Sequence, residues 1–500
     1  MSATCTMGVD VGTTGCKAVV FDNAGLVKAS AYREYPVLNT EDNGAELDSN
    51  RVMNQCLAVI AEAAGRMPLA VSAIGITSQG EAFTAVDHRG EHLCNGMVSS
   101  DVRAGRFARD WSREFGEGRL YGITGHTAHP MHTLFKLLWL KERKPDVWRR
   151  AAKFLCFEDL LEQRLGLDPA MGWPLAGRTM LFDVQRHEWS PDILGAIGLD
   201  AGRLARPLPS GTVAGTIPDA LAEGLRLARG ARVVTGGHDQ PCGALGAGVT
   251  EPGVAMYATG TVECITPAFD TATFTEALRA ANLCTYDHTV PGMYTTVAFS
   301  LTGGNLLKWF RDEFASEERA EAARTGRNAY ELILERATRE PSKLLVLPYF
   351  TPSGTPYFDL ETKGAILGLR LGTTRGEILR ALLEGVAFEM RLNLKIMEQS
   401  GCAIRELRAI GGGARSAFWT QLKADVLGKP ITALDVTEAG CLGVAMLARS
   451  AETNEPVRDL ARRWVRPIAR IEPQPDAAKE YSRRFETYRA MYPVLKSIPI

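Results

Sequence analysis

Residues 7–22 read Met-Gly-Val-Asp-Val-Gly-Thr-Thr-Gly-Cys-Lys-Ala-Val-Val-Phe-Asp, two short apolar runs joined by a Gly-Thr-Thr-Gly turn. Because the second apolar run follows the turn at once, the pattern predicts a β-hairpin with strands at residues 6–11 and 16–22. A phosphate loop of the Gly-Lys-Ser/Thr type is excluded, since it needs a helix after its glycines. Backbone N–H groups and two hydroxyls at such a turn still suit phosphate oxygens, and Asp10 beside it could hold a magnesium ion through water. An ordinary hairpin whose glycines take positive φ is the alternative.

The composition limits the classes of protein and partner. The 500 residues suffice for two or more domains, and 45% hydrophobic with 23% charged residues predicts a soluble globular protein. A net charge of −1 argues against nucleic acid or an anionic membrane as the main partner. No apolar run has the length of a membrane span and the first strand begins close to Met1, so we expect a cytoplasmic protein without a signal peptide. The ten cysteines stand singly without zinc-site spacing, as in a protein with reduced thiols.

The pattern of the first hairpin recurs near the middle of the chain. Residues 253–257 and 262–266 are predicted strands on either side of a second glycine-threonine turn. This recurrence indicates an ancient duplication that produced two similar domains, residues 1–245 and 246–500, facing each other across a cleft.

Apolar periodicity and capping residues predict further elements. The expected helices are residues 48–66, 100–165 as a helical region, 377–394, 418–427 and the chain from about 473; the expected strands are 27–35, 71–77, 82–87, 232–235 and 407–413. Several strands end in short turns of glycine and polar residues, among them 10–14, 79–81, 236–240, 260–261 and 411–416. In layered α/β folds ligands gather where strand ends face a crevice, so these turns predict one ligand cleft.

Asp239 is the strongest candidate for a catalytic residue. It follows a short predicted strand and two glycines, Gly236 and Gly237, so that a substrate could approach it closely. A carboxylate in a cleft can accept the proton of a substrate hydroxyl, which contributes roughly 10²–10⁴-fold to a rate. Asp239 also suits the N-cap of a helix beginning near Gln240, and the two roles are compatible.

Three histidines, His126, His129 and His132, recur every third residue. A metal site is one interpretation, but Pro130 interrupts any helix that would hold all three, and no acidic or cysteine ligand lies nearby in the sequence. The favoured interpretation is loop histidines that are hydrogen-bonded to backbone or that contact a substrate.

Two stretches resemble the signature sequences of the FGGY family of carbohydrate kinases. One is residues 133–142, Thr-Leu-Phe-Lys-Leu-Leu-Trp-Leu-Lys-Glu; the other is residues 364–369, Gly-Ala-Ile-Leu-Gly-Leu, followed by residues 377–384, Glu-Ile-Leu-Arg-Ala-Leu-Leu-Glu. The resemblance extends over essentially the full chain. It implies an α/β fold with two ribonuclease H-like domains of the actin/hexokinase type around a central cleft. It also implies transfer of the γ-phosphoryl group of MgATP to a hydroxyl of a sugar or polyol.

The same resemblance implies roles for individual residues. Asp239 corresponds to the catalytic base, and Asp10 to the acidic residue near Mg²⁺. The residues implied to bind ATP are Asp10, Gly12, Thr13, Thr14, Lys17, Gly260, Thr261, Gly304, Gly411, Gly412, Gly413 and Ser416. Those implied to contact the sugar are Gln79, Gly80, Glu81, Asp101, Arg103, Asp239 and Gln240. Phosphoryl transfer relies on positioning and charge stabilisation, which such a set of residues supplies.

The residues on the sugar side depart from several known members of the family. Xylulose kinases usually have Met-His-Gly after the residue equivalent to Gln79, where this chain has Gly80-Glu81-Ala82, and glycerol kinases have Arg-Glu there. Trp173 stands near where many members have an aspartate and could stack on a sugar, although packing is the commoner role of a loop tryptophan. Similarity over the whole chain favours a pentulose such as xylulose as the acceptor. A sugar acid of the gluconate type and a small polyol such as glycerol or erythritol are the alternatives.

An actin-like ATPase or chaperone without sugar kinase activity is the alternative from another class. It would share the two phosphate-binding turns but would lack the sugar-side residues, so Asp101, Arg103 and Asp239 favour the kinase. A sugar sensor that has lost catalysis is disfavoured because Asp10 and Thr261 are also present. The expected partners are MgATP and a small sugar, with neither nucleic acid nor membrane, and a homodimer is the habit of the family.

Overall fold

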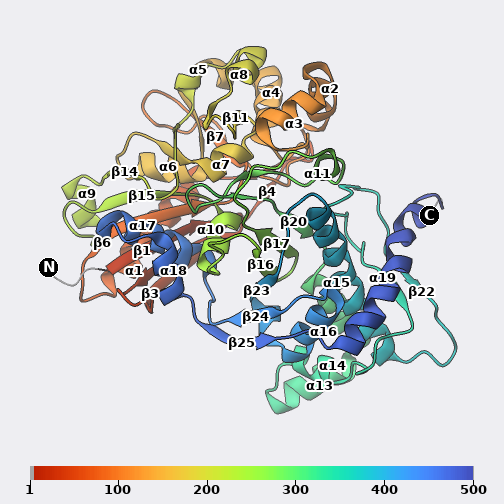
Figure 1. Cartoon of the computed structure of the whole chain (residues 1–500). Helices are drawn as coiled ribbons and strands as arrows, with labels where there is room; N and C mark the ends of the chain where they lie inside the picture. The colour runs from red at the N-terminus through yellow and green to blue at the C-terminus, as the bar shows by residue number, and fades with distance from the viewer. Residues whose placement is uncertain (1–4, 499–500) are drawn as a thin grey trace.

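A six-stranded mixed sheet organises the first half of the chain (Figure 1). The structure, a computed structural model, describes residues 5–498. The strand order is β14-β15-β6-β1-β2-β3, with bounds β1 (Cys5–Val11), β2 (Gly15–Phe21), β3 (Val27–Glu34), β6 (Val71–Ser78), β14 (Val213–Thr216) and β15 (Arg232–His238). The expected hairpin is present, because β1 and β2 pair antiparallel with Asp10 opposite Lys17. Helix α1 (Ser49–Gly65) begins at Asp48, whose side chain accepts a hydrogen bond from the backbone N–H of Arg51.

A second sheet repeats the topology of the first. Its order is β20-β17-β16-β23-β24-β25, with bounds β16 (Val254–Thr259), β17 (Glu263–Pro267), β20 (Ala298–Ser300), β23 (Glu406–Ile410), β24 (Ile431–Leu434) and β25 (Pro467–Ile471). Taken from β3 toward β14, the first sheet has three antiparallel strands, two further strands parallel to the third, and an antiparallel edge strand. Taken from β20 toward β25, the second sheet has the same sequence of pairings. The equal order and equal sense of pairing agree with the duplication that the two glycine-threonine turns predict.

Two helices, α10 (Asp239–Gly246) and α17 (Ala439–Thr453), cross in close contact where the two halves meet (Figure 1). Glycines make this crossing possible: a Cβ atom at Gly246 would lie 1.9 Å from the carbonyl oxygen of Ala439, and one at Gly443 would lie 2.0 Å from that of Cys242. Helix α17 also packs on β1 and β6, so a segment from the end of the chain covers a face of the first sheet. The expected division between residues 245 and 246 stays a prediction.

The segment between β6 and β14 contributes several helices and three strands of a small sheet, whose other two strands come from the segment between β3 and β6. The sheet has the order β4-β5-β8-β7-β9, with bounds β4 (Leu38–Asn39), β5 (Ala45–Leu47), β7 (Phe83–Val86), β8 (Gly96–Met97) and β9 (Lys153–Cys156). The helices include α2 (Gly105–Phe115), α3 (Glu117–Thr124), α4 (Thr133–Arg143), α5 (Pro145–Arg150), α6 (Phe157–Arg164), α7 (Trp173–Arg178) and α8 (Pro191–Ile197). The expectation of a helical region over residues 100–165 is wrong at β9, a largely buried strand that pairs with β7. Four residues are too short a run to reveal a strand period in the sequence.

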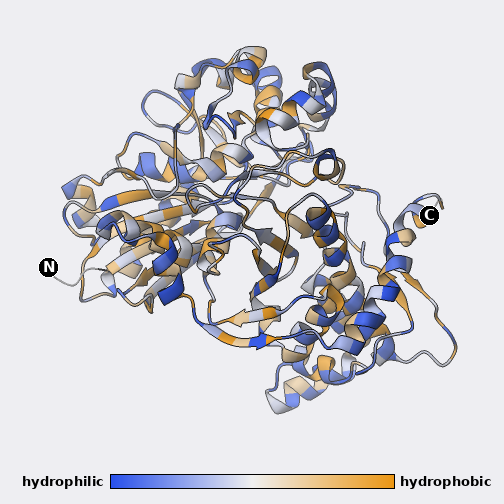
Figure 2. Ribbon diagram, in the orientation of Figure 1, coloured by the Kyte–Doolittle hydropathy of each residue, from blue (hydrophilic) through white to orange (hydrophobic). Residues whose placement is uncertain are grey.

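Helices cover the second sheet and end the chain. Those used below are α12 (Gly304–Phe314), α14 (Ala329–Glu335), α15 (Arg375–Gln399), α16 (Ala417–Leu427) and α19 (Pro475–Lys496). A capping box between Thr374 and Glu377 starts α15, which is longer than the expected 377–394. The expected strand at 407–413 ends at Ile410, because Gly411 takes φ 89° and turns the chain toward α16. Figure 2 shows hydrophobic residues along the strands of the first sheet and mixed colours on the outer helices.

No helix among residues 5–498 is long and apolar enough to cross a membrane. All ten cysteines are free, as expected, and nine of them are buried. The cytoplasmic location and the homodimer stay predictions.

Candidate active site

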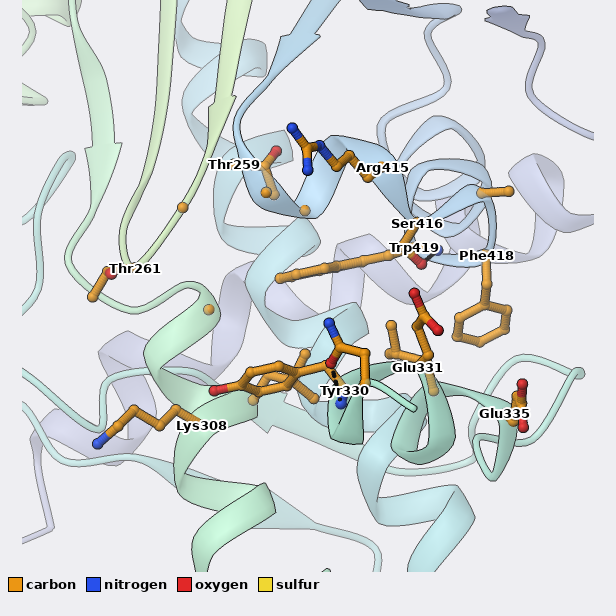
Figure 3. A pocket seen from close by; sticks show the side chains of 18 of the residues that line it. Thr259, Thr261, Lys308, Tyr330, Glu331, Glu335, Arg415, Ser416, Phe418 and Trp419 are labelled. Atoms are coloured by element: carbon orange, nitrogen blue, oxygen red, sulfur yellow. Dashed lines mark hydrogen bonds between the residues drawn. The ribbon is translucent and has the colours of Figure 1, made fainter. Parts of the chain in front are cut away.

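Two cavities contain residues expected at the site. The larger of these two lies in the second half of the chain, between the turn after β16 and helices α12, α14 and α16, and has a volume of about 730 Å³. Six of the residues expected to bind ATP line it: Gly260, Thr261, Gly304, Gly412, Gly413 and Ser416. Figure 3 shows Tyr330 and Trp419 near each other inside this cavity, with Lys308 extending from α12. Tyr330, Phe418 and Trp419 give it an aromatic lining that the sequence did not indicate, because α14 and α16 are far apart along the chain.

Backbone atoms form part of the wall of the larger cavity because there is no room for side chains. The N–H of Gly304 donates to the carbonyl oxygen of Gly260 at 2.9 Å, and a Cβ atom at Gly304 would lie 2.6 Å from that oxygen. Gly411 does not itself line the cavity, but a Cβ atom there would lie 2.5 Å from the carbonyl oxygen of Thr259. Its positive φ turns Gly412 and Gly413 toward the cavity. Turns of exposed backbone next to a helix N-terminus suit phosphate groups.

The smaller cavity, of about 220 Å³, is lined by residues from both halves of the chain. The structure brings together here six expected residues, Thr13, Gln79, Gly80, Glu81, Asp239 and Gln240. The second half contributes Cys264, Asn282, Phe299 and Phe358. The Oε1 atom of Gln240 is buried and has no hydrogen-bond partner among the described residues, so it can accept a bond from a ligand hydroxyl.

Asp239 stands at the end of β15 as the first residue of α10. The pairing of β15 with β6 shifts register between Thr235 and Gly237, and Gly237 has φ 118°. This irregularity bends the strand just before Asp239. The buried side chain of Glu158 on α6 holds this bend, since its Oε1 accepts the N–H of Gly236 at 2.8 Å and its Oε2 accepts the N–H of Gly172 at 3.1 Å. The predicted strand and a helix directly after it are both present and aim Asp239 into the cavity, but the expected N-cap role of Asp239 is wrong, because the helix begins one residue earlier and His238 is its N-cap.

The environment of Asp239 raises its pKa toward neutrality. Desolvation raises its pKa to about 7, with the charges of Asp10 and Glu81 adding to the shift and that of Arg178 opposing it. Its side chain still exposes 34% of its surface. A base with a pKa near the operating pH, open to the cavity, can accept a hydroxyl proton.

The turn of the first hairpin is fixed by hydrogen bonds. Thr13 Oγ1 donates to Gln79 Oε1 at 2.9 Å, and Gln79 Nε2 donates to the carbonyl oxygen of Gly12 at 3.1 Å. Thr14 is exposed, and Lys17 Nζ lies 2.6 Å from Glu438 Oε1 at the start of α17. Of the expected ATP-binding residues on this hairpin, only Thr13 lines either cavity.

Asp10 fits a role beside a hydrated cation. Its Oδ1 is buried without a hydrogen-bond partner among residues 5–498. Burial and the nearby charge of Glu438 raise its pKa to about 6, while Lys17 opposes the shift. The described residues contain no group of three or more His, Cys, Asp or Glu side chains that could hold a metal ion. Water and phosphate oxygens would therefore have to complete the shell of Mg²⁺.

Glu81 forms a buried ion pair with Arg178 in the wall of the smaller cavity. Burial alone would raise the pKa of Glu81, but Arg178, together with the bond that Ser99 Oγ donates to Glu81 Oε2 at 2.7 Å, lowers it overall. Lys136 Nζ lies behind, 3.4 Å from the carbonyl oxygen of Glu81. Arg178 was missed from the sequence, although a single arginine within the run Leu-Ala-Gly-Arg-Thr-Met is a signal of a paired charge.

Two other expected sugar contacts and the unusual tryptophan lie outside the lining of this cavity. Arg103 Nη2 lies 2.6 Å from both Asp101 Oδ2 and Glu46 Oε1, and the Asp101 side chain is fully buried. Trp173 stacks on His187, with ring centroids 3.9 Å apart and an angle of 6° between the planes. Packing therefore accounts for Trp173, and sugar contact by Asp101 and Arg103 stays a prediction.

Each of the three regularly spaced histidines has a hydrogen bond to a backbone atom, in agreement with the favoured interpretation. His126 Nδ1 lies 2.7 Å from the carbonyl oxygen of Thr124, and His132 Nδ1 lies 3.1 Å from that of Arg178. The N–H of Met131 donates to His129 Nδ1 at 3.2 Å. His126 and His132 line the smaller cavity, and burial lowers the pKa of His126 to about 3, so its ring is neutral.

Two sheets of equal topology, joined by crossing helices and flanked by two cavities that gather the expected site residues, define an α/β two-domain sugar kinase fold of the actin/hexokinase type. The family models confirm the predicted resemblance: the FGGY N-terminal domain matches residues 5–246, and the FGGY C-terminal domain matches residues 255–452. The chain belongs to the FGGY family of carbohydrate kinases. Membership of this family sets aside the alternative of an actin-like ATPase without sugar kinase activity.

The relatives differ in the substrates that their names state. The xylulose kinase of Bacillus subtilis is 25% identical over 499 residues, which cover 98% of this chain and 97% of that protein. The autoinducer-2 kinase of Enterobacter sp. is 29% identical over 505 residues, which cover 97% of this chain and 93% of that protein. The crystal structure of gluconate kinase from Lactobacillus acidophilus matches the fold with a TM-score of 0.91 at 22% identity, covering 99% of each chain.

Proposed function

We propose that this carbohydrate kinase transfers the γ-phosphoryl group of MgATP to a hydroxyl of a pentulose such as xylulose, with Asp239 as the general base. The observation that carries the proposal is the position of Asp239, which stands in the smaller cavity beside Gln79 and Glu81 with its pKa raised to about 7 by desolvation. A carboxylate so placed can take the proton of an acceptor hydroxyl as that hydroxyl attacks a phosphoryl group.

The larger cavity supports ATP as the donor. Its aromatic residues, Tyr330, Phe418 and Trp419, offer flat apolar surfaces for a purine ring, and its backbone turns at Gly260 and Gly304 suit phosphates. Mg²⁺, when bound, would neutralise phosphate charge, and Asp10 is the residue that would hold it through water. The three aromatic rings would orient the nucleotide, while the turn at Thr261 and the hairpin at Thr13 would contact its phosphate end.

The smaller cavity would hold the acceptor for in-line attack. Glu81 Oε2, Arg178 and Gln240 Oε1 offer fixed polar groups to several hydroxyls, and Asp239 receives the proton. Phe299 and Phe358 from the second half complete the wall. Closing the two halves around the acceptor would exclude water, which otherwise competes for the phosphoryl group.

The charges of the smaller cavity favour a neutral acceptor over a sugar acid. Arg178 is the single Lys or Arg side chain among the lining residues that the structure describes, and Glu81 already neutralises it. A carboxylate buried there would have no unpaired cation and would lie near Asp239, at a high desolvation cost. Full-length similarity to xylulose kinases supports a pentulose among the neutral acceptors.

An ADP-release assay across pentuloses, hexuloses, aldonates and polyols tests the proposal, with Asp239→Asn as the matched variant. We expect turnover with a pentulose, loss of turnover in Asp239→Asn, and MgATP binding close to that of the wild type. Turnover on an aldonate alone would move the substrate to the sugar acids. Near-normal turnover by Asp239→Asn would remove this residue from the role of base.

A further inference from the structure

His238 lies between the candidate base and a buried tyrosine from the other half of the chain. Its Nε2 is 3.1 Å from Asp239 Oδ1, and its Nδ1 is 2.8 Å from the hydroxyl oxygen of Tyr286. The side chains of His238 and Tyr286 are both buried, and His238 lines the smaller cavity. The three side chains therefore form a row of polar contacts that ends at the carboxylate of Asp239.

The ring hydrogen of His238 and the hydroxyl hydrogen of Tyr286 each have one favourable position. Burial, together with the charge of Arg178, lowers the pKa of His238 to about 3, so the ring is neutral and has a single N–H. An ionised carboxylate can only accept a hydrogen bond, whereas a tyrosine hydroxyl can donate one. The arrangement that satisfies both neighbours places the ring hydrogen on Nε2, toward Asp239, and lets the Tyr286 hydroxyl donate to Nδ1.

We propose that His238 and Tyr286 are positioning residues for phosphoryl transfer. Tyr286 fixes the tautomer of His238, so that the polar Nε2 edge of the ring faces Oδ1 of Asp239 at 3.1 Å as an electrostatic contact and leaves the other oxygen of the carboxylate free to accept the hydroxyl proton. The proposal rests on the proposed function, since it gives His238 a role only if Asp239 is the base.

Packing and backbone hydrogen bonds fix Tyr286 in the position from which its hydroxyl contacts His238. Tyr286 belongs to β18 (Tyr286–Asp287), and a Cβ atom added at Gly177 on α7 would lie 3.2 Å from the Cβ atom of Tyr286. Just before it, the N–H of Thr285 donates to the carbonyl oxygen of Gly125 at 2.8 Å, and Tyr121 donates from its hydroxyl to the carbonyl oxygen of Leu283 at 3.0 Å. A segment from the second half is thus docked into the first half beside the base.

The absence of a side chain at position 80 leaves room for the imidazole ring of His238. A Cβ atom at Gly80 would lie 2.9 Å from both Cδ2 and Nε2 of His238, so only glycine at position 80 leaves the ring in place. Besides Asp239 itself, the charged groups that act on the ring are Arg178, which opposes its protonation, and Glu81, which favours it. As N-cap of α10, His238 makes no side-chain capping bond, so capping does not explain a histidine here.

Steady-state kinetics of ADP release with the pentulose separates positioning from packing. We expect His238→Ala to lower kcat by about 10²-fold, the scale of a misplaced catalytic group, with the KM for ATP unchanged. His238→Gln, which restores one side-chain N–H donor, should recover part of kcat. Tyr286→Phe keeps the ring packing and should lower kcat, and the double variant His238→Ala/Tyr286→Phe should be no slower than His238→Ala alone.

A second buried histidine provides the matched control. His288 is only two residues from Tyr286 and does not line the smaller cavity; its Nδ1 accepts the N–H of Val290 at 3.1 Å. His288→Gln should leave kcat unchanged, and thermal melts of all variants identify any that fail to fold. Wild-type kcat in folded His238→Ala or in Tyr286→Phe overturns the proposal while an inactive Asp239→Asn keeps the base assignment. An active Asp239→Asn would instead overturn the proposed function itself.

Discussion

Glu81 and Arg178 meet in the wall of the smaller cavity as a buried ion pair between two segments almost a hundred positions apart in the chain. Their side chains are only 4% and 11% exposed. Glu81 adopts φ 62°, a left-handed conformation that is rare for a residue other than glycine, asparagine or aspartate. Backbone strain at a cavity persists only where the surroundings determine the conformation, and here Ser99, Thr133 and Arg178 all bind Glu81.

Removing one partner of this pair should damage both stability and acceptor binding. Arg178→Ala leaves the Glu81 carboxylate buried and unpaired, at a cost of about 3–5 kcal/mol in the free energy of unfolding. Arg178→Lys keeps a positive charge but loses the planar fork, so its unfolding cost should be smaller while the KM for the sugar still rises. Urea denaturation and steady-state kinetics measure the two effects. An unchanged KM for the sugar in folded Arg178→Lys would show that the pair is structural alone.

The pH dependence of kcat/KM should report the base. Desolvation raises the pKa of Asp239 to about 7, and only the ionised form can accept a proton. Activity should therefore fall as the pH drops below about 7, with a slope of one on a logarithmic plot, and not near the ordinary aspartate value of 3.8. The rates are measured with saturating MgATP to hold donor binding constant. An acidic limb near pH 4 would contradict the environment described for Asp239.

The sequence allowed the first hairpin, its repeat and the strand-to-helix position of Asp239 to be predicted, because each is a local pattern of apolar runs and glycines. Arg178 and Tyr286 could not be predicted, since each acts through a partner supplied by tertiary contact: Glu81 for the first and His238 for the second. The short strand β9 was missed for a related reason, because pairing with β7 and not its own period defines it.

Gly80→Ala should slow catalysis without disturbing the nucleotide site. The new methyl group would lie 2.9 Å from His238 Nε2, so the ring must move away from its contact with Asp239. We expect a lower kcat, an unchanged KM for ATP and a normal fold, because Gly80 does not have the positive φ that would strain an alanine. Gly118→Ala on α3 is the control, since a Cβ atom there has no neighbour within 4 Å. Equal kinetics for the two variants would argue against His238 as a positioning residue.

Substituting a glycine where α10 and α17 cross should destabilise the junction of the two halves. A Cβ atom at Gly443 would lie 2.0 Å from the carbonyl oxygen of Cys242, and that oxygen belongs to a helix backbone that cannot rotate away. Gly443→Ala should therefore cost about 1–3 kcal/mol or more in the free energy of unfolding, since overpacking forces the two helices apart. Gly224→Ala, on the short helix α9 (Asp219–Gly224) where a Cβ atom has no neighbour within 4 Å, should be neutral or slightly stabilising. Urea denaturation measures both changes, and small-angle scattering with sugar and a non-hydrolysable ATP analogue reports whether the halves still close. A fully stable Gly443→Ala that compacts like the wild type would mean that this close contact does not constrain the junction.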